Sequence, residues 1–491
     1  MMESSKQDVP CIFSQRWILS YFVFIGITLQ NALRSNLSVA IVCMVKTGNI
    51  SSESRVNNSY PEHCKLHIDG QIPIENAEFD WDKSTQAKLL SSFFYGYICT
   101  QIIGGWLSDT YGGRRVFGIA LIISGICSLV TPVCARTSVY AVFVARVILG
   151  LSSGVVLPSG NSIIGRWAPL FEKSKLTSFA CLGVAFGIVV SFITSGYLCK
   201  HGFDNGWGSI FYLTGGLTVL WAVAWFLIAR DTPDQNKWIS KAELNYIKSN
   251  IQFDTSKRTA VVPWCQIATN PAFLAILVAH FCVNWVLYAL VTSIPIFMKT
   301  VLKYDIKSNG ALSSLPFACQ VTTGFLLSQL VDFLRKRSLI STTLIRRLCS
   351  CLGFVGSGVF LIGTGFTSCE DREIAVVLLS LAFLFAGFHN AGCLVNNIDI
   401  GQKYAGTLFG LTNTLATVPG MVAPIVTSIL TPNDTAEEWR NMFYVCAGVC
   451  LLGIVVYGCL ASGEVQEWAK DETEVNIEKP KNIDKKENTK F

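Results

Sequence analysis

The stretch that decides the fold is GWLSDTYGGRR at residues 105–115, a short polar turn between two long apolar runs. Its glycines permit a tight turn of the backbone. Asp109 can lie at a helix end and pair with a neighbouring arginine, Arg114 or Arg115. A loop fixed in this way at the ends of two helices is expected to hold one conformation of the protein.

Outward from this turn, apolar runs recur along the whole chain, and a run of about 18 or more residues indicates a membrane span. Backbone groups in hydrocarbon need internal partners, and the alternating pattern of a β-barrel does not appear, so the spans are predicted to be helices. We predict an all-α polytopic membrane protein with twelve transmembrane helices. Their predicted positions are 17–45, 87–107, 116–134, 139–164, 177–198, 208–229, 272–297, 308–331, 343–364, 374–395, 405–430 and 439–461.

The composition of the 491 residues agrees with a membrane protein. Hydrophobic residues make up 51% of the chain and charged residues only 15%, whereas a soluble protein carries about 25% charged residues. The net charge of +6 comes from basic residues scattered through short loops, which argues against a nucleic-acid partner. Most of the 18 cysteines lie in apolar runs and are expected to be small buried hydrophobes, such as Cys127, Cys181, Cys282, Cys319 and Cys450.

Lysine and arginine are unevenly divided between the two sets of short loops. If the N-terminus is cytosolic, the cytosolic loops hold most of them, so the positive-inside rule predicts that both termini are cytosolic.

The first loop on the opposite side, 46–86, carries glycosylation triplets at Asn49 and Asn57. Cys64 in that loop and Cys369 in a later one lie on the side where disulfides form, but the sequence alone does not pair them.

The longest cytosolic connection divides the spans six and six. The N-terminus lacks the pattern of a cleaved signal peptide, so the first span is expected to remain. The C-terminal segment mixes Lys, Glu, Asp and Asn and cannot bury enough surface to fold alone. The predicted organisation is a cytosolic tail, a six-helix bundle, a cytosolic linker, a second six-helix bundle and a disordered cytosolic tail, at 1–16, 17–229, 230–271, 272–461 and 462–491.

A weaker copy of the polar turn, SQLVDFLRKR, occupies residues 328–337, six spans after the first. Both stretches resemble the cytosolic loop signature of the major facilitator superfamily, although Thr110 stands where Lys or Arg is usual. The resemblance implies two parallel halves of six helices, with substrate bound between them near the middle of the membrane. It also implies that four charged residues control the change of conformation: Asp109, Arg114, Arg115 and Asp332.

Further segments narrow the resemblance to the anion-cation symporter family. They are ALRSNLSVA at 32–40, SFFYGYI at 92–98, RWAP at 166–169, NIDI at 397–400 and YAGT at 404–407. That family includes sialin, the vesicular glutamate transporters and the type I sodium-phosphate cotransporters, and TPN at 431–433 looks most like the sialin branch. The resemblance covers nearly the whole chain and implies a carrier of small anions.

Two arginines lie inside predicted spans, and neither span has an interior Asp or Glu: they are Arg34 and Arg146. An ionisable residue at the centre of a membrane helix costs at least about 2.5 kcal/mol, which makes it a functional hypothesis. Guanidinium groups that face a cavity suit a carboxylate or phosphate, which arginine binds through two hydrogen bonds. We predict that both arginines bind substrate, and the alternatives are snorkelling to a headgroup or capping of carbonyl groups between helices.

Four more side chains are predicted to line the cavity and to bond the hydroxyl groups of a sugar acid, with helix packing as the alternative: Tyr95, Tyr97, Asn284 and Tyr288. A proton-coupled carrier also needs a group that gains and loses a proton. The candidates for that role are His280, His389 and Asp399, although a single histidine on an apolar span is more often a packed core residue.

The span at 139–164 departs from the proton-coupled members of the family. Those members carry glutamates in the segment that begins at the matched arginine, whereas Leu149 and Ser153 occupy these positions here. A histidine that follows is replaced by Asn161. This departure puts proton coupling in doubt and favours transport driven by membrane potential, exchange or sodium.

We expect a secondary active transporter of organic anions, such as sialic acid or a related acidic sugar, that works by alternating access in an endolysosomal, vesicular or plasma membrane. A sodium-dependent phosphate or urate transporter, a voltage-driven anion transporter and a non-transporting sensor stay open as alternatives. No nucleophile-base pair or metal cluster marks the spans, so we expect neither an enzyme nor a cofactor beyond a coupling H+ or Na+. The expected partners are a small organic anion and the lipid bilayer, with the protein as a monomer.

Overall fold

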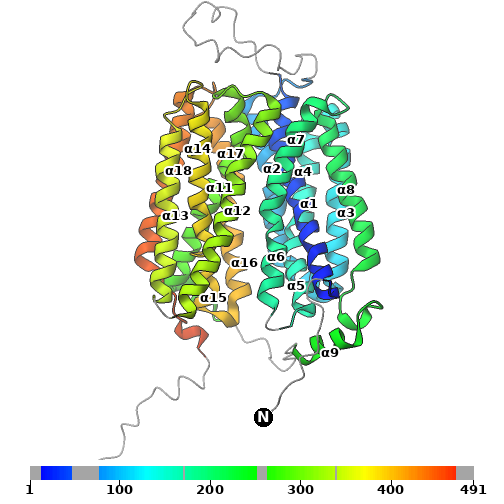
Figure 1. Ribbon diagram of the computed structural model, residues 1–491. Helices are drawn as coiled ribbons and strands as arrows, with labels where there is room; N and C mark the ends of the chain where they lie inside the picture. Colours follow the sequence, from blue (N-terminus) through cyan, green and yellow to red (C-terminus); the bar gives the residue numbers. More distant parts are fainter. Residues whose placement is uncertain (1–12, 47–76, 170–171, 251–261, 338–339, 471–491) are drawn as a thin grey trace, which may run out of the picture.

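The computed structural model describes residues 13–46, 77–169, 172–250, 262–337 and 340–470. Asn49, Asn57 and Cys64 lie outside these ranges. The described chain forms two helical bundles that stand side by side, the first at the right and the second at the left of Figure 1. Below, the end at which α1 begins and α18 ends, at the bottom of Figure 1, is called the lower end, and the opposite end is the upper end.

The first half runs alternately up and down the bundle, as the predicted spans require. Its helices are α1 (Gln15–Met44), α2 (Lys83–Tyr111), α3 (Gly113–Thr137), α4 (Val139–Gly154), α5 (Val156–Trp167), α6 (Lys173–Cys181), α7 (Gly183–His201) and α8 (Trp207–Ile228). The polar turn at 105–115 does join two helices at the lower end. Gly112 there has a φ of 89°, and a Cβ at this position would lie 2.9 Å from an Asp231 carboxylate oxygen, so the turn requires glycine.

The second half repeats this course after a linker that contains η5 (Pro233–Gln235), α9 (Lys241–Asn250) and α10 (Trp264–Thr269). Its helices are α11 (Pro271–Thr300), α12 (Ile306–Lys336), α13 (Thr342–Thr364), α14 (Arg372–Ala386), η6 (Gly387–Asn390), α15 (Asn396–Ile400), η7 (Gln402–Tyr404), α16 (Ala405–Leu415), α17 (Val418–Leu430) and α18 (Ala436–Leu460), followed by η8 (Glu467–Ala469). The all-α fold predicted from the apolar runs is confirmed.

Several predicted spans are interrupted helices. The span at 139–164 breaks at Val155 into α4 and α5, because Pro158 has no N–H to donate to the carbonyl of Gly154. The span at 405–430 breaks before Val418 in the same way, since Pro419 cannot bond the carbonyl of Leu415. The span at 374–395 ends early in a short 3-10 turn at Gly387. Broken helices expose backbone groups where they face the interior of a bundle.

Ten helical stretches in the described chain are long and apolar enough to cross a membrane. The two predicted spans that fall outside this set are α1 and α2, although they have 30 and 29 residues. Their composition is more polar because α1 buries Gln30, Asn31 and Asn36 inside the bundle. In α2 the buried polar side chains include Ser91, Ser92 and Gln101.

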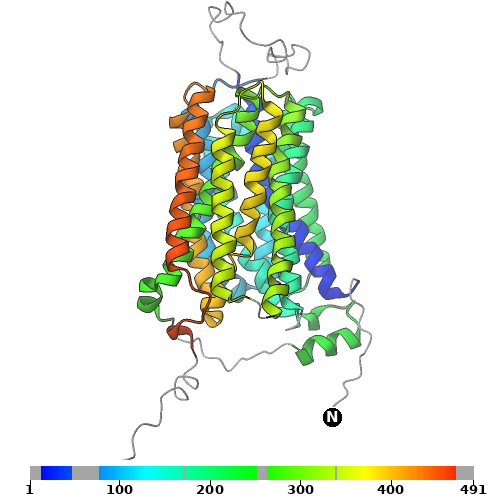
Figure 2. The same ribbon diagram turned by 60° about the vertical axis from the view of Figure 1, so that its left-hand side comes forward.

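The linker is fastened to the lower end of the first half. The carboxylate of Glu243 in α9 accepts hydrogen bonds from the backbone N–H groups of Gln15 and Arg16, which satisfies free donors at the start of α1. The Arg16 guanidinium also pairs with Glu172 at 2.7 Å. In Figure 2 the blue start of α1 lies directly above the green linker helix. The part of the linker with η5 and α9 is thus attached to the first half, whereas Ile267 of α10 belongs to the hydrophobic core of the second half.

A disulfide joins the upper ends of α1 and α7. It links Cys43 to Cys199, with the two Cα atoms 6.4 Å apart. Cys369, in the upper loop between α13 and α14, is also disulfide-bonded. Of the cysteines expected to be small buried hydrophobes, Cys127, Cys282 and Cys450 are free and buried. Cys181 and Cys319 are free but only partly buried, so the prediction is wrong for these two.

The two halves contact each other at the middle and at the upper end. The Phe192 ring of α7 packs edge-on against Phe317 of α12, with centroids 5.4 Å apart. Gly310 of α12 approaches the same part of α7 so closely that a Cβ would lie 2.6 Å from the Phe192 carbonyl oxygen. At the upper end, Lys299 of α11 donates a 2.7 Å hydrogen bond to the Val42 carbonyl of α1.

Within the first half, α2 and α4 touch along their backbones. A Cβ on Gly150 would lie 1.9 Å from the Phe93 carbonyl oxygen, and one on Gly96 would lie 2.0 Å from the Val147 carbonyl oxygen. Small residues at helix contacts are typical of membrane bundles, where close packing drives association. This contact fixes α2 against α4.

We predict that Gly150→Ala lowers the melting temperature of the purified protein in detergent. The added methyl group meets backbone atoms that cannot rotate away, and such overpacking costs about 1 to 3 kcal/mol. The matched control is Gly216→Ala in α8, where nothing lies within 4 Å of the new Cβ and alanine improves helix propensity. A Gly150 variant as stable as the Gly216 variant would contradict the proposed close contact.

Candidate functional site

Arg34 lies on the polar face of α1, about ten residues below the upper end of that helix. On the same helix Gln30, Asn31, Ser35 and Ser38 are all buried. These polar side chains recur at helical spacing, so α1 turns one hydrophilic face toward the interior of the protein.

Four aromatic rings surround the Arg34 guanidinium. Its central carbon lies 4.6 Å from the ring centre of Tyr288, 4.9 Å from Phe94, 5.3 Å from Phe93 and 5.8 Å from Tyr97. Phe93, Phe94 and Tyr97 belong to α2 in the first half, whereas Tyr288 belongs to α11 in the second. Aromatic faces attract cations, so both halves contribute to holding this charge.

The Arg34 guanidinium has no hydrogen-bond or ion-pair partner among the described residues. Aromatic contacts return only part of the free energy that a guanidinium loses when it leaves water. An oxyanion between the rings would supply the missing charge and accept two parallel hydrogen bonds. The site is therefore electrostatically suited to an anion.

Arg146 of α4 has a different environment. It is 2% exposed, and it donates hydrogen bonds to the carbonyls of Leu33 and Arg34, at 3.0 and 2.8 Å. Its Nε has no partner in the described structure. The structure thus gives Arg146 the carbonyl-capping position named above as an alternative, while it leaves one donor free beside the site.

A small hollow opens where these groups meet. It is lined by Arg34, Ser35, Ser38, Leu90, Phe93, Phe94, Arg146, Val291 and Thr292. The lining comes from α1, α2 and α4 of the first half and from α11 of the second. A ligand here would touch both halves at once.

The predicted cavity residues are only partly brought together. Tyr97 and Tyr288 face Arg34. Asn284 lies one turn below Tyr288 on α11, and its side chain donates to the His280 carbonyl. Tyr95 lies apart from the site, because it is 39% exposed and packs against Phe143 of α4.

A polar bridge that was not predicted from the sequence joins the two halves. The Gln101 amide of α2 donates to Thr417 at 2.6 Å and accepts a hydrogen bond from Asn413 of α16 at 2.5 Å. Gln101 lies one helical turn below Tyr97, on the same face of α2. The signal that could have found it is that spacing: Phe93, Tyr97 and Gln101 recur every four residues.

The three candidate proton sites lie in the second half. His280 is buried on α11, two turns below Tyr288, with its ring against Phe409. His389 is buried against Phe354, with ring centres 4.2 Å apart. Asp399 accepts hydrogen bonds from Arg335 at 3.1 Å and from Arg346 at 2.7 Å near the lower end. Only His280 is on a helix that carries a site residue.

The charged loop residues lie at the lower end, as their motif implies. Arg115 of the polar turn is exposed. Arg114 is bonded to α8 and to the segment after it, because its backbone N–H donates to Asp231 at 2.8 Å and its guanidinium donates to the Phe226 carbonyl. The Asp109 side chain lies outside the described part of the structure. In the second copy Asp332 is exposed, and the acid that joins helix ends there is Asp399.

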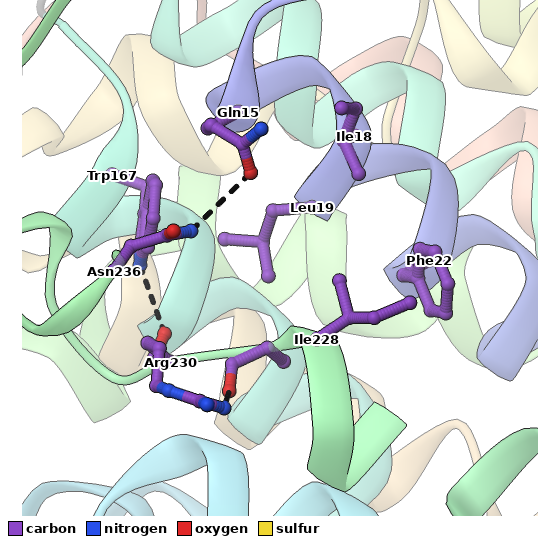
Figure 3. Close-up of a pocket in the computed structure, with 9 residues that line it drawn as sticks. Gln15, Ile18, Leu19, Phe22, Trp167, Ile228, Arg230 and Asn236 are labelled. Atoms are coloured by element: carbon purple, nitrogen blue, oxygen red, sulfur yellow. Dashed lines mark hydrogen bonds between the residues drawn. The ribbon is translucent and has the colours of Figure 1, made fainter. Parts of the chain in front are cut away.

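A second hollow lies at the lower end, between α1, α5, α8 and the linker (Figure 3). Its lining is mostly apolar, and its polar groups are occupied. Asn236 donates to Gln15 at 3.3 Å, Trp167 donates to the Arg230 carbonyl at 3.0 Å, and the Arg230 guanidinium bonds carbonyls of its own segment. This hollow belongs to the attachment of the linker. No group of three or more His, Cys, Asp or Glu side chains suited to a metal occurs in the described ranges.

The fold and site define a multi-pass membrane transporter, and comparison with known proteins gives the family. The profile of the family described as Major Facilitator Superfamily matches residues 23–424. Human sialin is 37% identical over 466 residues, covering 94% of this chain and 92% of sialin. Vesicular glutamate transporter 1 of Xenopus laevis is 34% identical over 470 residues, covering 95% of this chain and 78% of that protein. The chain belongs to the major facilitator superfamily and, within it, to the anion-cation symporter family of sialin and the vesicular glutamate transporters.

Solved structures share the fold at low sequence identity. A bacterial homologue of the human lysosomal transporter Spinster, in an inward-facing and occupied conformation, superposes with a TM-score of 0.67 at 15% identity, over 90% of this chain and 96% of that one. A D-xylose–proton symporter gives a TM-score of 0.63 at 13% identity, over 91% and 99%. The predicted major facilitator fold and family are thus confirmed.

The two arginines are predicted to differ in their effect on stability. Arg146→Ala removes two charge-assisted hydrogen bonds and leaves a cavity, which should cost about 2 to 4 kcal/mol. Arg34→Ala removes a cation that has no anionic partner, so its cost should be under about 1 kcal/mol. Melting temperatures of the two variants in detergent without substrate measure the difference, and an equal or larger loss for Arg34→Ala would contradict the assignment.

Proposed function

We propose that this protein is a secondary active transporter of organic anions that works by alternating access and binds the substrate carboxylate at Arg34. The observation that carries the proposal is the Arg34 guanidinium, enclosed by rings from both halves and without a counterion in the described structure. Arg146 supports it by fixing the backbone of α1 at Leu33 and Arg34. Catalytic activity is not part of the proposal, since the relatives are transporters.

The proposed substrate is sialic acid or a related acidic sugar. The 37% identity with sialin supports this class. The polar groups below Arg34 also support it, because the hydroxyls of Tyr97 and Tyr288 and the amides of Gln101 and Asn413 offer donors and acceptors for a polyol body. The carboxylate would lie at Arg34 and the hydroxylated part would extend toward Gln101.

We place the upper end on the side of the membrane opposite the cytosol, with both termini cytosolic. Disulfides persist in oxidising compartments, and both disulfide-bonded positions, at Cys43–Cys199 and at Cys369, are at the upper end. The proposed location is an endolysosomal or vesicular membrane, as the vesicular glutamate transporters suggest by name, or the plasma membrane. We propose that the monomer is the transporting unit.

The second part of the proposal concerns the coupling ion. The side chains at the two positions of the family glutamates favour coupling that does not use a proton-binding group there. Leu149, at one of those positions, is 1% exposed, and Ser153, at the other, bonds Gln30 and the Leu149 carbonyl. Neither side chain titrates. We propose coupling to membrane potential, exchange or sodium, which keeps a phosphate or urate carrier as the alternative. His280 is the proposed proton site should a proton gradient drive uptake.

The direct test is uptake of radiolabelled sialic acid into proteoliposomes. Arg34→Ala should reduce the initial rate about 100-fold or more, because two charge-assisted hydrogen bonds to the carboxylate are lost. Arg34→Lys keeps the charge but not the bidentate geometry, so it should raise KM about 10-fold or more with a smaller effect on the maximal rate.

Tyr95→Phe is the matched control for this experiment, since Tyr95 is on α2 but apart from the site, and it should transport at the parental rate. Unchanged uptake by a folded Arg34→Ala protein would refute the proposed site. Uptake could instead follow an imposed proton gradient at clamped voltage in the parent and lose this response in His280→Gln. Those two results together would support a proton symporter. No uptake of sialic acid by the parent would direct the same assay to urate, phosphate and sodium.

A further inference from the structure

An ion pair joins the two halves at the upper end. Lys83, in the first turn of α2, pairs with Asp434, in the loop between α17 and α18. The Lys83 side chain is 28% exposed and the Asp434 side chain 19%, so the pair is partly withdrawn from water. One partner belongs to the first half and the other to the second, whereas the ion pairs of Arg16 and Asp399 each lie on one side of the interface.

The loop around Asp434 is built to hold this carboxylate in place. Asp434 has a φ of 56°, in the left-handed region that costs a non-glycine residue about 1 kcal/mol or more. Glu438 fixes the flanking residues: it accepts hydrogen bonds from the Asn433 backbone at 2.9 Å and the Thr435 backbone at 3.2 Å. Thr435 and Glu438 also form a capping box at the start of α18. A strained residue that its surroundings hold in one position indicates a specific role.

Three lysines act on this one carboxylate. Lys83 comes from the first half, and Lys299 and Lys303 come from the second, at and just beyond the end of α11. Burial lowers the pKa of Lys303, and Asp434 opposes that shift. Glu438, in the first turn of α18, also interacts with Lys83. Without Asp434, the cations of the two halves would repel each other across the interface.

Lys299 adds a second connection between the halves at the same level. It donates to the carbonyl of Val42, in the last turn of α1, where helix carbonyls have no partner within the helix. A cation at a helix C-terminus is also favoured by the helix dipole. The upper end is therefore closed by two lysines that reach across the interface in opposite directions.

We propose that Lys83 and Asp434 form the latch that keeps the upper end of the carrier closed. Opening this end requires the pair to separate, so the strength of the pair sets how often the Arg34 site is exposed to that side. The inference rests on the alternating access proposed above, but not on the identity of the substrate. Lys83 and Asp434 are positioning residues, because neither lines the hollow beside Arg34.

Hydrogen–deuterium exchange with mass spectrometry, on the full chain in lipid nanodiscs without substrate, tests the latch. In Lys83→Gln and in Asp434→Asn, peptides covering 83–92 and 290–302 at the upper end should exchange about 5-fold faster or more, a shift typical of conformational coupling. Peptides covering 163–169 and 396–404 at the lower end should keep or lower their exchange rates.

Lys46→Gln is the matched control, since Lys46 pairs with Asp80 at the upper end within the first half alone, at 45% and 77% exposure. Its upper peptides should exchange as in the parent. Parental exchange in both single variants, or faster exchange at both ends, would overturn the latch. Because the readout needs no substrate, failure of the latch leaves the Arg34 transport test intact, and loss of transport in Arg34→Ala leaves the latch intact.

Discussion

The constraint on which the rest of the structure depends is the placement of one unneutralised guanidinium in the middle of a membrane bundle. Arg34 is held there because α1 turns a polar face inward, α2 and α11 supply aromatic faces, and Arg146 of α4 binds the backbone behind it. Of these elements, α4 and α11 are apolar enough to cross a membrane by composition, whereas α1 and α2 fall outside that set. All four helices line the site.

The architecture could be predicted from the sequence because membrane burial leaves a strong and simple signal. Long apolar runs locate helices, the repeated polar turn identifies two halves, and the glycine in that turn at Gly112 is required by its φ. The interruptions within spans were less visible. Pro158 and Pro419 mark two of them, and the rules of helix hydrogen bonding place each break a few residues earlier.

The site could be predicted only in part. The sequence gives the composition of a helix, but it does not show directly which side of the helix faces the interior of the protein. The positions of Arg34, Tyr97 and Tyr288 agree with a shared site, whereas Tyr95, two residues from Tyr97, points out of the bundle, as helical geometry requires. Arg146 was expected to bind substrate on the same grounds as Arg34, yet its hydrogen bonds go to carbonyls. Contacts between distant helices, such as Gln101 with Thr417, depend on tertiary packing that no local pattern records.

The disulfide between Cys43 and Cys199 makes α1 and α7 a single mechanical unit at the upper end. Phe192 of α7 packs against α12 of the other half, and Arg34 of α1 lies against Tyr288 of α11. Because the disulfide links their upper ends, a rocking motion of the second half would tilt α1 and α7 together and would not slide one past the other. Reduction of the Cys43–Cys199 disulfide would let α7 move with α12 independently of α1, so the motion would no longer be passed on to Arg34.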